Sequence, residues 1–525
     1  MRARRRLLVL TAAIGLSLLA PSAALSHEGS VKQSALEGPI AEADEGEHSE
    51  NMELIANLQF PEEVGGGFYR ATDLDFHTYR VSGGESPKVL PPSARGGKER
   101  DFAFVGTALN GLHVVDITDR ENPRHVTHYD CRISQSDVFV FEQADRVLAA
   151  YSLDTVAQNQ PEGSACHEEL GVTDSSERGT FLIDITDPYD PHAVSFLPMA
   201  KGTHQVTVHP SGEYVYNSAA VVVTTEPGYI EVYDIGDQAT PEEPELVDEI
   251  ELHTGLDSHD GTFNEDGTRF YSAALTHSFV IDTSDPRDNE IVGRIYDPAI
   301  NIHHDAHAVT VDTVYGEREF MLIGDELAGA IGTGLCPGGG VHVYDITGDL
   351  EQAPAKVGAF FIPEVRVEPD PDASPLDQPT CTAHVLDIQE DEQLISIAWY
   401  NAGVRVLDYS GLAELGPQGV SFGIAPFLGG SLTPGIVEVG HYRLPDSNLW
   451  SAKVPEVEDD GSFYIYGGDI TRTLDVFRFD ATAPRQPDGG SWLNESEALA
   501  QAPSSTTRLL EPGGSDGWKQ LLSVD

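Results

Sequence analysis

The sequence predicts an all-β protein, a seven-bladed β-propeller of four-stranded antiparallel blades. Three observations lead to this fold. A strand that ends in aspartate recurs along the chain, helical periodicity is almost absent, and 51 glycines and 33 prolines separate short apolar runs throughout the 525 residues. Many short strands joined by turn residues are typical of all-β folds. Radial repetition of small sheets is typical of propellers.

The recurring segment has an apolar strand, an aspartate, a polar turn and a second strand. Clear copies are LHVVDITDRENPRHV (112–126), TFLIDITDPYDPHAV (180–194) and VHVYDITGDLEQAPAKV (341–357). The aspartates of the six copies are Asp116, Asp184, Asp234, Asp282, Asp345 and Asp408, and Arg478 replaces the aspartate in a divergent seventh copy. An aspartate at a strand end accepts hydrogen bonds from the amides of the following turn, so this column is predicted to be structural.

Two further strands precede each copy. The second of the two is apolar, as in FAFVGTA (102–108) and LISIAWY (394–400). A turn such as NEDGT or QEDEQ separates it from the first strand of the unit. Each unit therefore holds about four strands, and seven units extend from about Phe68 to Asp480. Closure of such units into a ring protects their sheet edges. A pair of two-sheet sandwiches is the alternative, and seven in-phase copies argue against it.

The cores VVDITD and LIDITDP resemble the LVIVD-repeat family of secreted bacterial β-propeller proteins. The resemblance covers most of residues 100–480. It implies a propeller fold and export from the cell, but no defined activity.

The two ends of the chain differ in composition from the repeats. Residues 1–26 have a basic start, an apolar stretch and small residues near a cleavage site, as in a secretory signal peptide. We expect an acidic disordered linker over 27–55, the propeller over 56–480 and a flexible tail over 481–525. The protein is then secreted, extracellular or in the cell envelope, with no membrane span after cleavage. The adjacent arginines Arg4, Arg5 and Arg6 leave the twin-arginine route open beside the general one.

The formal net charge is −55, from 86 acidic and 31 basic residues. Nucleic acids and anionic membranes repel such a surface. The partner classes that remain are a small-molecule substrate and an extracellular protein or glycan.

Four cysteines in an exported protein predict disulfides. The repeat register favours Cys131–Cys166 and Cys336–Cys381 among three pairings. A metal-thiolate site is the lesser alternative because no CxxC pair is present. The long insertions 152–178 and 325–340, the second with Asp325 and Glu326, are expected on one face of the ring.

A column of histidines emerges when the first strand of each unit is aligned on the turn that follows it. The aligned residues are Thr72, Asp137, His204, His259, His307, His384 and Lys453. First strands line the channel of a propeller, so these side chains should converge on its axis. Imidazole nitrogens are good ligands for Fe, Cu, Zn or Mn. His204, His259, His307 and His384 are thus predicted to bind a divalent transition metal.

The remaining aligned residues, Asp137, Lys453 and Thr72, are candidates for an additional ligand or for the channel wall. His303 and His304 precede the aligned strand, and we expect them in its connecting loop. The structural alternative for all of these histidines is a polar, water-filled channel.

No catalytic residue can be named from the sequence. Four histidines on a seven-bladed propeller are similar in plan to the iron site of carotenoid oxygenases, which favours a metal-dependent oxidoreductase. Zinc would favour a hydrolase instead. The alternative function is a non-catalytic extracellular propeller that binds a protein, a glycan or a surface through its loop face.

Overall fold

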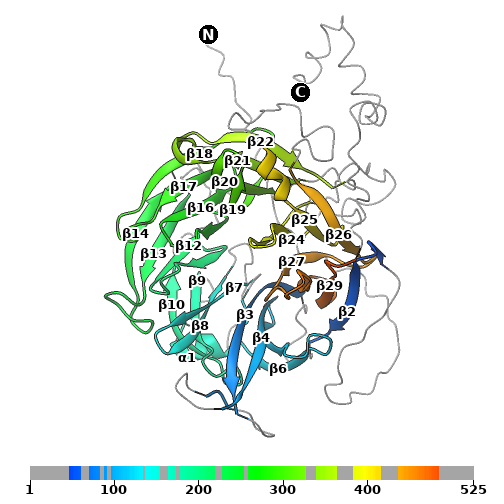
Figure 1. The fold of residues 1–525 in the computed structure, drawn as a ribbon. Coiled ribbons are helices and arrows are strands. Elements are labelled where there is room, and N and C mark those ends of the chain that lie inside the picture. The colour runs from blue at the N-terminus through cyan, green and yellow to red at the C-terminus, as the bar shows by residue number, and fades with distance from the viewer. Residues whose placement is uncertain are drawn as a thin grey trace, which may run out of the picture.

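Seven antiparallel sheets surround a central channel in the computed structural model, which confirms the predicted fold class (Figure 1). Six sheets have four strands and one has five. The structure describes residues 46–60, 70–82, 88–90, 96–133, 136–153, 164–172, 178–199, 202–218, 228–252, 258–326, 339–362, 382–415 and 435–483.

Each of the first four blades runs from its innermost to its outermost strand in chain order. Blade 1 comprises β3 (Arg70–Val81), β4 (Lys98–Ala108), β5 (Gly111–Asp116) and β6 (Arg124–Tyr129). Blade 2 comprises β7 (Asp137–Gln143), β8 (Arg146–Ser152), β9 (Gly179–Asp184) and β10 (His192–Pro198), with helix α1 (Ala165–Leu170) before β9. Blade 3 comprises β11 (Val206–Val208), β12 (Tyr214–Ser218), β13 (Tyr229–Asp234) and β14 (Glu245–Glu251). Blade 4 comprises β15 (Asp260–Phe263), β16 (Arg269–Ala274), β17 (His277–Asp282) and β18 (Glu290–Ile295).

The last three blades complete the ring. Blade 5 comprises β19 (His303–Thr313), β20 (Gly316–Asp325), β21 (Val341–Asp345) and β22 (Ala355–Phe360), with the 3-10 helix η2 (Gly348–Gln352). Blade 6 comprises β23 (Leu386–Gln389), β24 (Leu394–Ala398), β25 (Val404–Asp408), β26 (Val437–Arg443) and the added β1 (Glu47–His48), with η5 (Ser410–Glu414). Blade 7 comprises β27 (Leu449–Lys453), β28 (Phe463–Asp469), β29 (Thr473–Phe479) and β2 (Met52–Leu58).

Strand β2 closes the ring, because it supplies the outer strand of the blade whose other three strands lie near the C-terminus. Leu54 pairs with Phe477 and Leu58 with Leu474. Residues 47–55 therefore belong to the propeller, whereas the sequence placed them in a linker. The predicted signal peptide, the linker up to residue 45 and the tail beyond residue 483 lie outside the described residues.

A β-bulge lets β2 pack against both neighbouring blades. The register of its pairing with β29 shifts at Ile55, between Leu54 and Ala56. Met52 and Leu54 join the core between blades 6 and 7, and Ala56 joins the core between blades 7 and 1. An extra residue in one strand turns the following side chains to the other face, so one short strand seals two interfaces.

The predicted aspartate column is confirmed as a set of turn-forming residues. In each of the six copies a carboxylate oxygen accepts a hydrogen bond from the amide two residues later. The accepting residues are Asp116, Asp184, Asp234, Asp282, Asp345 and Asp408. These bonds fix the turn that follows the third strand in six of the seven blades.

Side chains of the innermost strands also join one blade to the next. In each case a side-chain oxygen accepts a hydrogen bond from a backbone amide of the following blade. The pairs are Asp73 to Val138 (3.4 Å), Asp137 to Val206 (3.0 Å), Gln205 to Gly261 (3.2 Å) and Asp305 to Leu386 (2.8 Å), and on a second level Asp75 to Val140 (2.6 Å) and Asp387 to Val454 (2.7 Å). The polar lining of the channel thus holds the inner strands in register.

We predict that Leu54→Ala lowers the free energy of unfolding by about 2–5 kcal/mol, because it leaves a cavity in the interface that closes the ring. Leu54 is 7% exposed. The exposed neighbour Glu53 is the matched control, and Glu53→Ala should change stability by less than about 0.5 kcal/mol. Chemical denaturation followed by circular dichroism measures both values, and equal effects would contradict the closing role of β2.

Candidate metal centre

The histidine column is set by the strand pairing of blade 5. His303 pairs with Asp325 and Asp305 pairs with Gly324, so His304 is the extra residue of a β-bulge. The side chain of His304 lies beside those of His259 and His384, with ring centroids 4.6 and 4.2 Å apart. His304 is therefore the blade 5 member of the cluster, and its predicted place in a loop was wrong.

The structure brings together three of the four predicted ligands, His204, His259 and His384, but not His307. The Nε2 atom of His307 lies 3.1 Å from the carboxylate of Asp305, in the carboxylate-lined part of the channel. The prediction of His307 as a ligand was wrong because the hairpin between β19 and β20 is longer than its equivalents. An alignment that counts back from the turn therefore selects His307, which lies three residues after His304, the histidine that reaches the cluster.

The other aligned residues also lie away from the imidazole cluster. In blade 7, Lys453 forms an ion pair with Asp73 (2.8 Å). Asp137 accepts the inter-blade hydrogen bond from Val206. The Thr72 hydroxyl donates to the carbonyl of Ser136 (2.9 Å). All three stabilise the channel wall, and of the three only Asp137 lines the small cavity next to the histidines.

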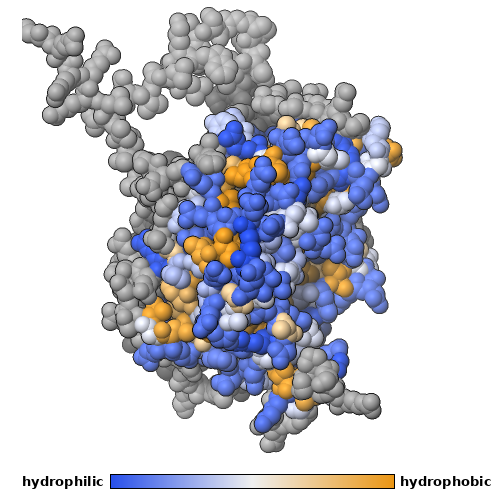
Figure 2. All heavy atoms as spheres, turned by 90° about the vertical axis from the view of Figure 1, so that its left-hand side faces the viewer, coloured by the Kyte–Doolittle hydropathy of each residue, from blue (hydrophilic) through white to orange (hydrophobic). Residues whose placement is uncertain are grey.

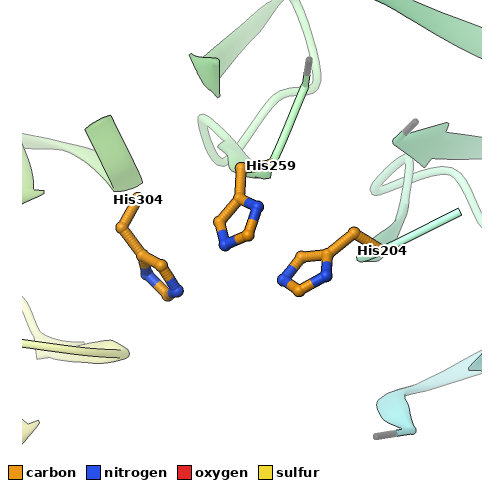
Figure 3. Close-up of side chains that lie close together, drawn as sticks. All are labelled: His204, His259 and His304. Atoms are coloured by element: carbon orange, nitrogen blue, oxygen red, sulfur yellow. The ribbon is translucent and has the colours of Figure 1, made fainter. Parts of the chain in front are cut away.

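Four imidazoles from four consecutive blades form the cluster. The rings of His204 and His259 stack with their centroids 3.7 Å apart. Figure 3 shows His204, His259 and His304 pointing toward a common point from separate segments of the chain. The donor nitrogens of these three histidines all lie within 4.8 Å of one another.

Glu326 adds a carboxylate to this group. It directly follows β20, and its amide donates to the carbonyl of Ile302 (3.1 Å). Its oxygens lie 3.6 Å from Nε2 of His304 and 3.7 Å from Nε2 of His384. The sequence placed Glu326 in a long insertion on the histidine face, but gave no sign that it reaches the axis.

Tyr400 holds Glu326 in place. Its hydroxyl donates to Oε1 of Glu326 over 2.6 Å, and its ring lies 4.9 Å from that of His384. Both side chains are buried. Tyr400 has a positive φ of 45°, a left-handed conformation that non-glycine residues rarely adopt.

A backbone hydrogen bond fixes the tautomer of His384. Its Nδ1 lies 2.6 Å from the carbonyl oxygen of Trp450. A carbonyl only accepts, so Nδ1 carries the proton and Nε2 keeps a free lone pair toward Glu326. This is the arrangement that orients an imidazole for a metal ion.

Burial favours the neutral form of three of the four imidazoles. Burial, assisted by neighbouring histidines, lowers the pKa of His259 and of His304 well below the ordinary value. Burial also lowers the pKa of His384, to about 4. Neutral imidazole is the form that binds metals, so the cluster is ready for an ion at neutral pH.

The donors form two overlapping groups that share His304, and each group could hold a metal ion: His204, His259 and His304 in one, and His304, Glu326 and His384 in the other. Ligand atoms at about 2.0–2.2 Å from one ion lie about 3–4.4 Å from one another, and both distances from Glu326 to the histidines fall in this range. His304 is 2% exposed, and its Nδ1 has no hydrogen-bond partner among the described residues. Nitrogen and carboxylate donors without thiolate suit Fe, Cu, Zn or Mn.

Two adjoining cavities lie along the channel beside the cluster. A small one of about 30 Å³ is lined by His204, His304 and His384 together with three aspartates. A wider one of about 630 Å³ extends from those same aspartates to the strand ends. Burial, together with repulsion from neighbouring aspartates, raises the pKa of Asp137 and of Asp260 well above the usual range. The channel therefore has a histidine layer and a carboxylate layer in contact.

The disulfide between Cys131 and Cys166 is confirmed. It joins the segment after β6 to helix α1. Cys336 and Cys381 lie outside the described residues, so their pairing stays a prediction.

The surface in view is mainly hydrophilic, with separate small hydrophobic patches, as expected from the acidic composition (Figure 2). Among the described ranges, no helix has the length and apolar character needed to cross a membrane.

Comparison with known proteins assigns neither a family nor a function to this chain. No family model matches the sequence, and no curated protein does. The LVIVD-repeat assignment therefore stays a prediction. Similar solved structures include a functionally unknown protein from Desulfotomaculum acetoxidans, with 15% identity, a TM-score of 0.39, and coverage of 64% of this chain and 85% of that one. Another is the hydrazine synthase of Kuenenia stuttgartiensis, with 12% identity, a TM-score of 0.44, and coverage of 72% and 93%.

We predict that the metal-free protein loses stability as the pH falls from about 6.5 to about 4. The folded state keeps His384 neutral down to a pKa of about 4, whereas the unfolded chain takes up this proton near 6.5. The unfolded state then binds more protons, and a shift of this size corresponds to about 3 kcal/mol. Urea denaturation in the presence of chelator measures the pH dependence.

The change His384→Gln should make this pH dependence shallower. His192 is exposed at the start of β10, and His192→Gln is the control that should leave the curve unchanged. Parallel curves for the wild type and His384→Gln would contradict the neutral state of the buried ring.

Proposed function

We propose that this protein is a secreted propeller of the LVIVD-repeat type that binds one transition-metal ion at its axis and acts as a metal-dependent oxidoreductase. The observation that carries the proposal is the convergence of four imidazoles and one carboxylate from consecutive blades. The disulfide and the signal-like N-terminal sequence support export.

His204, His259, His304 and His384 would hold the ion, with Glu326 as an anionic donor. A bound redox-active ion supplies electron exchange with a small substrate. The protein's own residues define the rest of the site. Tyr400 orients the carboxylate, and the Trp450 carbonyl orients His384.

The donor set favours oxidoreductase chemistry over hydrolysis. A hydrolytic zinc site keeps three protein ligands and an open position for water. Four histidines with a carboxylate instead offer up to five donors, which suits Fe, Cu or Mn. The identity of the natural ion decides between the two, and metal analysis together with electron paramagnetic resonance of protein from its own host measures it. An ion that is redox-silent under oxidants and reductants would overturn the oxidoreductase assignment.

We predict that the wild type binds one equivalent of metal per chain and that His304→Ala abolishes stoichiometric binding, because it removes the residue shared by both donor groups. Mass spectrometry of metals and calorimetric titration with Zn²⁺ measure the stoichiometry. The matched control is His307→Ala, three residues along the same strand, which should retain one equivalent. Retention by His304→Ala together with loss by His307→Ala would place the ion elsewhere in the channel.

We also predict that Tyr400→Phe weakens metal binding by about 10- to 100-fold, which is typical for loss of a residue that orients a ligand. The phenyl ring keeps the packing against His384 and removes only the hydroxyl. Competition with a chelator of known affinity measures the change. Unchanged affinity would show that Glu326 does not depend on this hydrogen bond for its position.

A further inference from the structure

Asp260 occupies a special position in the channel, at the neck between the two cavities. Five residues line both cavities: Asp73, Asp137, Gln205, Asp260 and Val385. Three of the five are aspartates. Any ion or molecule that passes from the wide cavity to the histidine layer must pass these carboxylates.

The three aspartates at the neck differ in their hydrogen-bond and ion-pair partners. Asp73 is paired with Lys453 (2.8 Å), and Asp137 accepts the inter-blade hydrogen bond from Val206. Asp260 accepts only from the amide of Gly261, its own neighbour (2.6 Å). Among the described residues, its second carboxylate oxygen has no hydrogen-bond partner. Among the described residues, Asp260 thus keeps one carboxylate oxygen available to a cation at the neck between the two cavities.

The wide cavity has an excess of negative charge. Its lining includes Asp73, Asp75, Asp137, Asp260, Asp305 and Asp387. Lys453 is the one lysine or arginine among the described lining residues, and it pairs with Asp73. Of the two lining histidines, His307 contacts Asp305 and His209 contacts Ser211 and the Gly267 carbonyl. A channel lined by one sign of charge concentrates oppositely charged ions and raises their rate of association.

The small cavity lies between the acidic wide cavity and the imidazole of His304. His304 lines it together with Asp260, and the Nδ1 of the nearly fully buried His304 has no partner among the described residues. A volume of about 30 Å³ exceeds the roughly 10–15 Å³ needed for one water molecule. An ion that has shed most of its water fits, and a larger organic molecule does not.

We propose that Asp260 is a transit site through which a divalent cation passes from the acidic channel to the histidine cluster. The inference rests on the proposed metal site and adds its access route. Asp260 binds the incoming cation transiently, offsets the loss of hydration, and transfers it to the imidazoles. The same path serves release, so the residue should affect the rates of binding and dissociation alike.

The test is a stopped-flow measurement of Co²⁺ uptake by the chelator-treated, full-length secreted protein, followed by the visible absorption of the bound ion. Asp260→Asn keeps the side-chain volume and the acceptor for the Gly261 amide. It should slow association by at least about fivefold, with unchanged stoichiometry and unchanged equilibrium affinity. The association rate should also depend less on salt than in the wild type.

The matched control is Asp312→Asn, at an exposed position of β19 outside both cavities. It should leave the uptake rate unchanged. If Asp260→Asn does not fold, Asp137→Asn is the second neck variant, since asparagine can still accept from the Val206 amide, and the same slowing is expected.

The outcomes separate the two proposals. A wild type that binds Co²⁺, with neck variants that take it up equally fast, would overturn the transit site and leave the metal centre standing. A neck variant that loses affinity without slowing would make Asp260 a permanent ligand, which also overturns the transit role. A wild type that binds no Co²⁺ or Zn²⁺ would overturn both proposals.

Discussion

A ring of seven blades requires that its last blade be held to its first, and a strand from the other end of the chain can do this. Here β2 meets that requirement by pairing with β29, and its bulge seals the interfaces on both sides. The geometry of the channel depends on this closure. Because the ring is closed, the innermost strands of the seven blades surround one axis. Side chains at equivalent positions of these strands therefore lie close together, although they are far apart in sequence.

The candidate metal centre depends on that convergence. Four blades each contribute one histidine to the group, and blade 5 also contributes Glu326. The inter-blade hydrogen bonds of the channel aspartates hold the strands at fixed heights. The residue next to a ligand can therefore serve the fold, since Asp305, beside His304, accepts a hydrogen bond from Leu386 of the next blade.

The repeats could be predicted from the sequence because each blade carries its own local signals. Apolar strands, a closing aspartate and a turn are short-range patterns, and the structure confirmed the blades, the aspartate column and the Cys131–Cys166 pair. The alignment of the inner strands was less secure. It counted from the following turn, and this count is valid only where the hairpins have equal length.

The alignment selected His307 instead of His304 because it assumed that the hairpins have equal length. The dipeptide His304-Asp305 repeats His259-Asp260, and this match was the available signal for the correct level. Nothing local could have identified Glu326 or Tyr400 as partners. Their contact joins the end of a strand in blade 5 to a backbone bridge between blades 6 and 7, and such contacts arise only when the ring exists. The strand-forming character of residues 47–55 was hidden for the same reason, since their partner lies at the far end of the chain.

The repeated placement of the histidines also has an evolutionary consequence. In most folds a new ligand requires a substitution at a position that already happens to face the site. In this ring, a blade copied whole carries its histidine to the axis at the same height as the original. A multi-ligand centre can therefore grow by duplication of a unit, and the β-bulge at His304 shows how a blade with a longer hairpin keeps its ligand at that height.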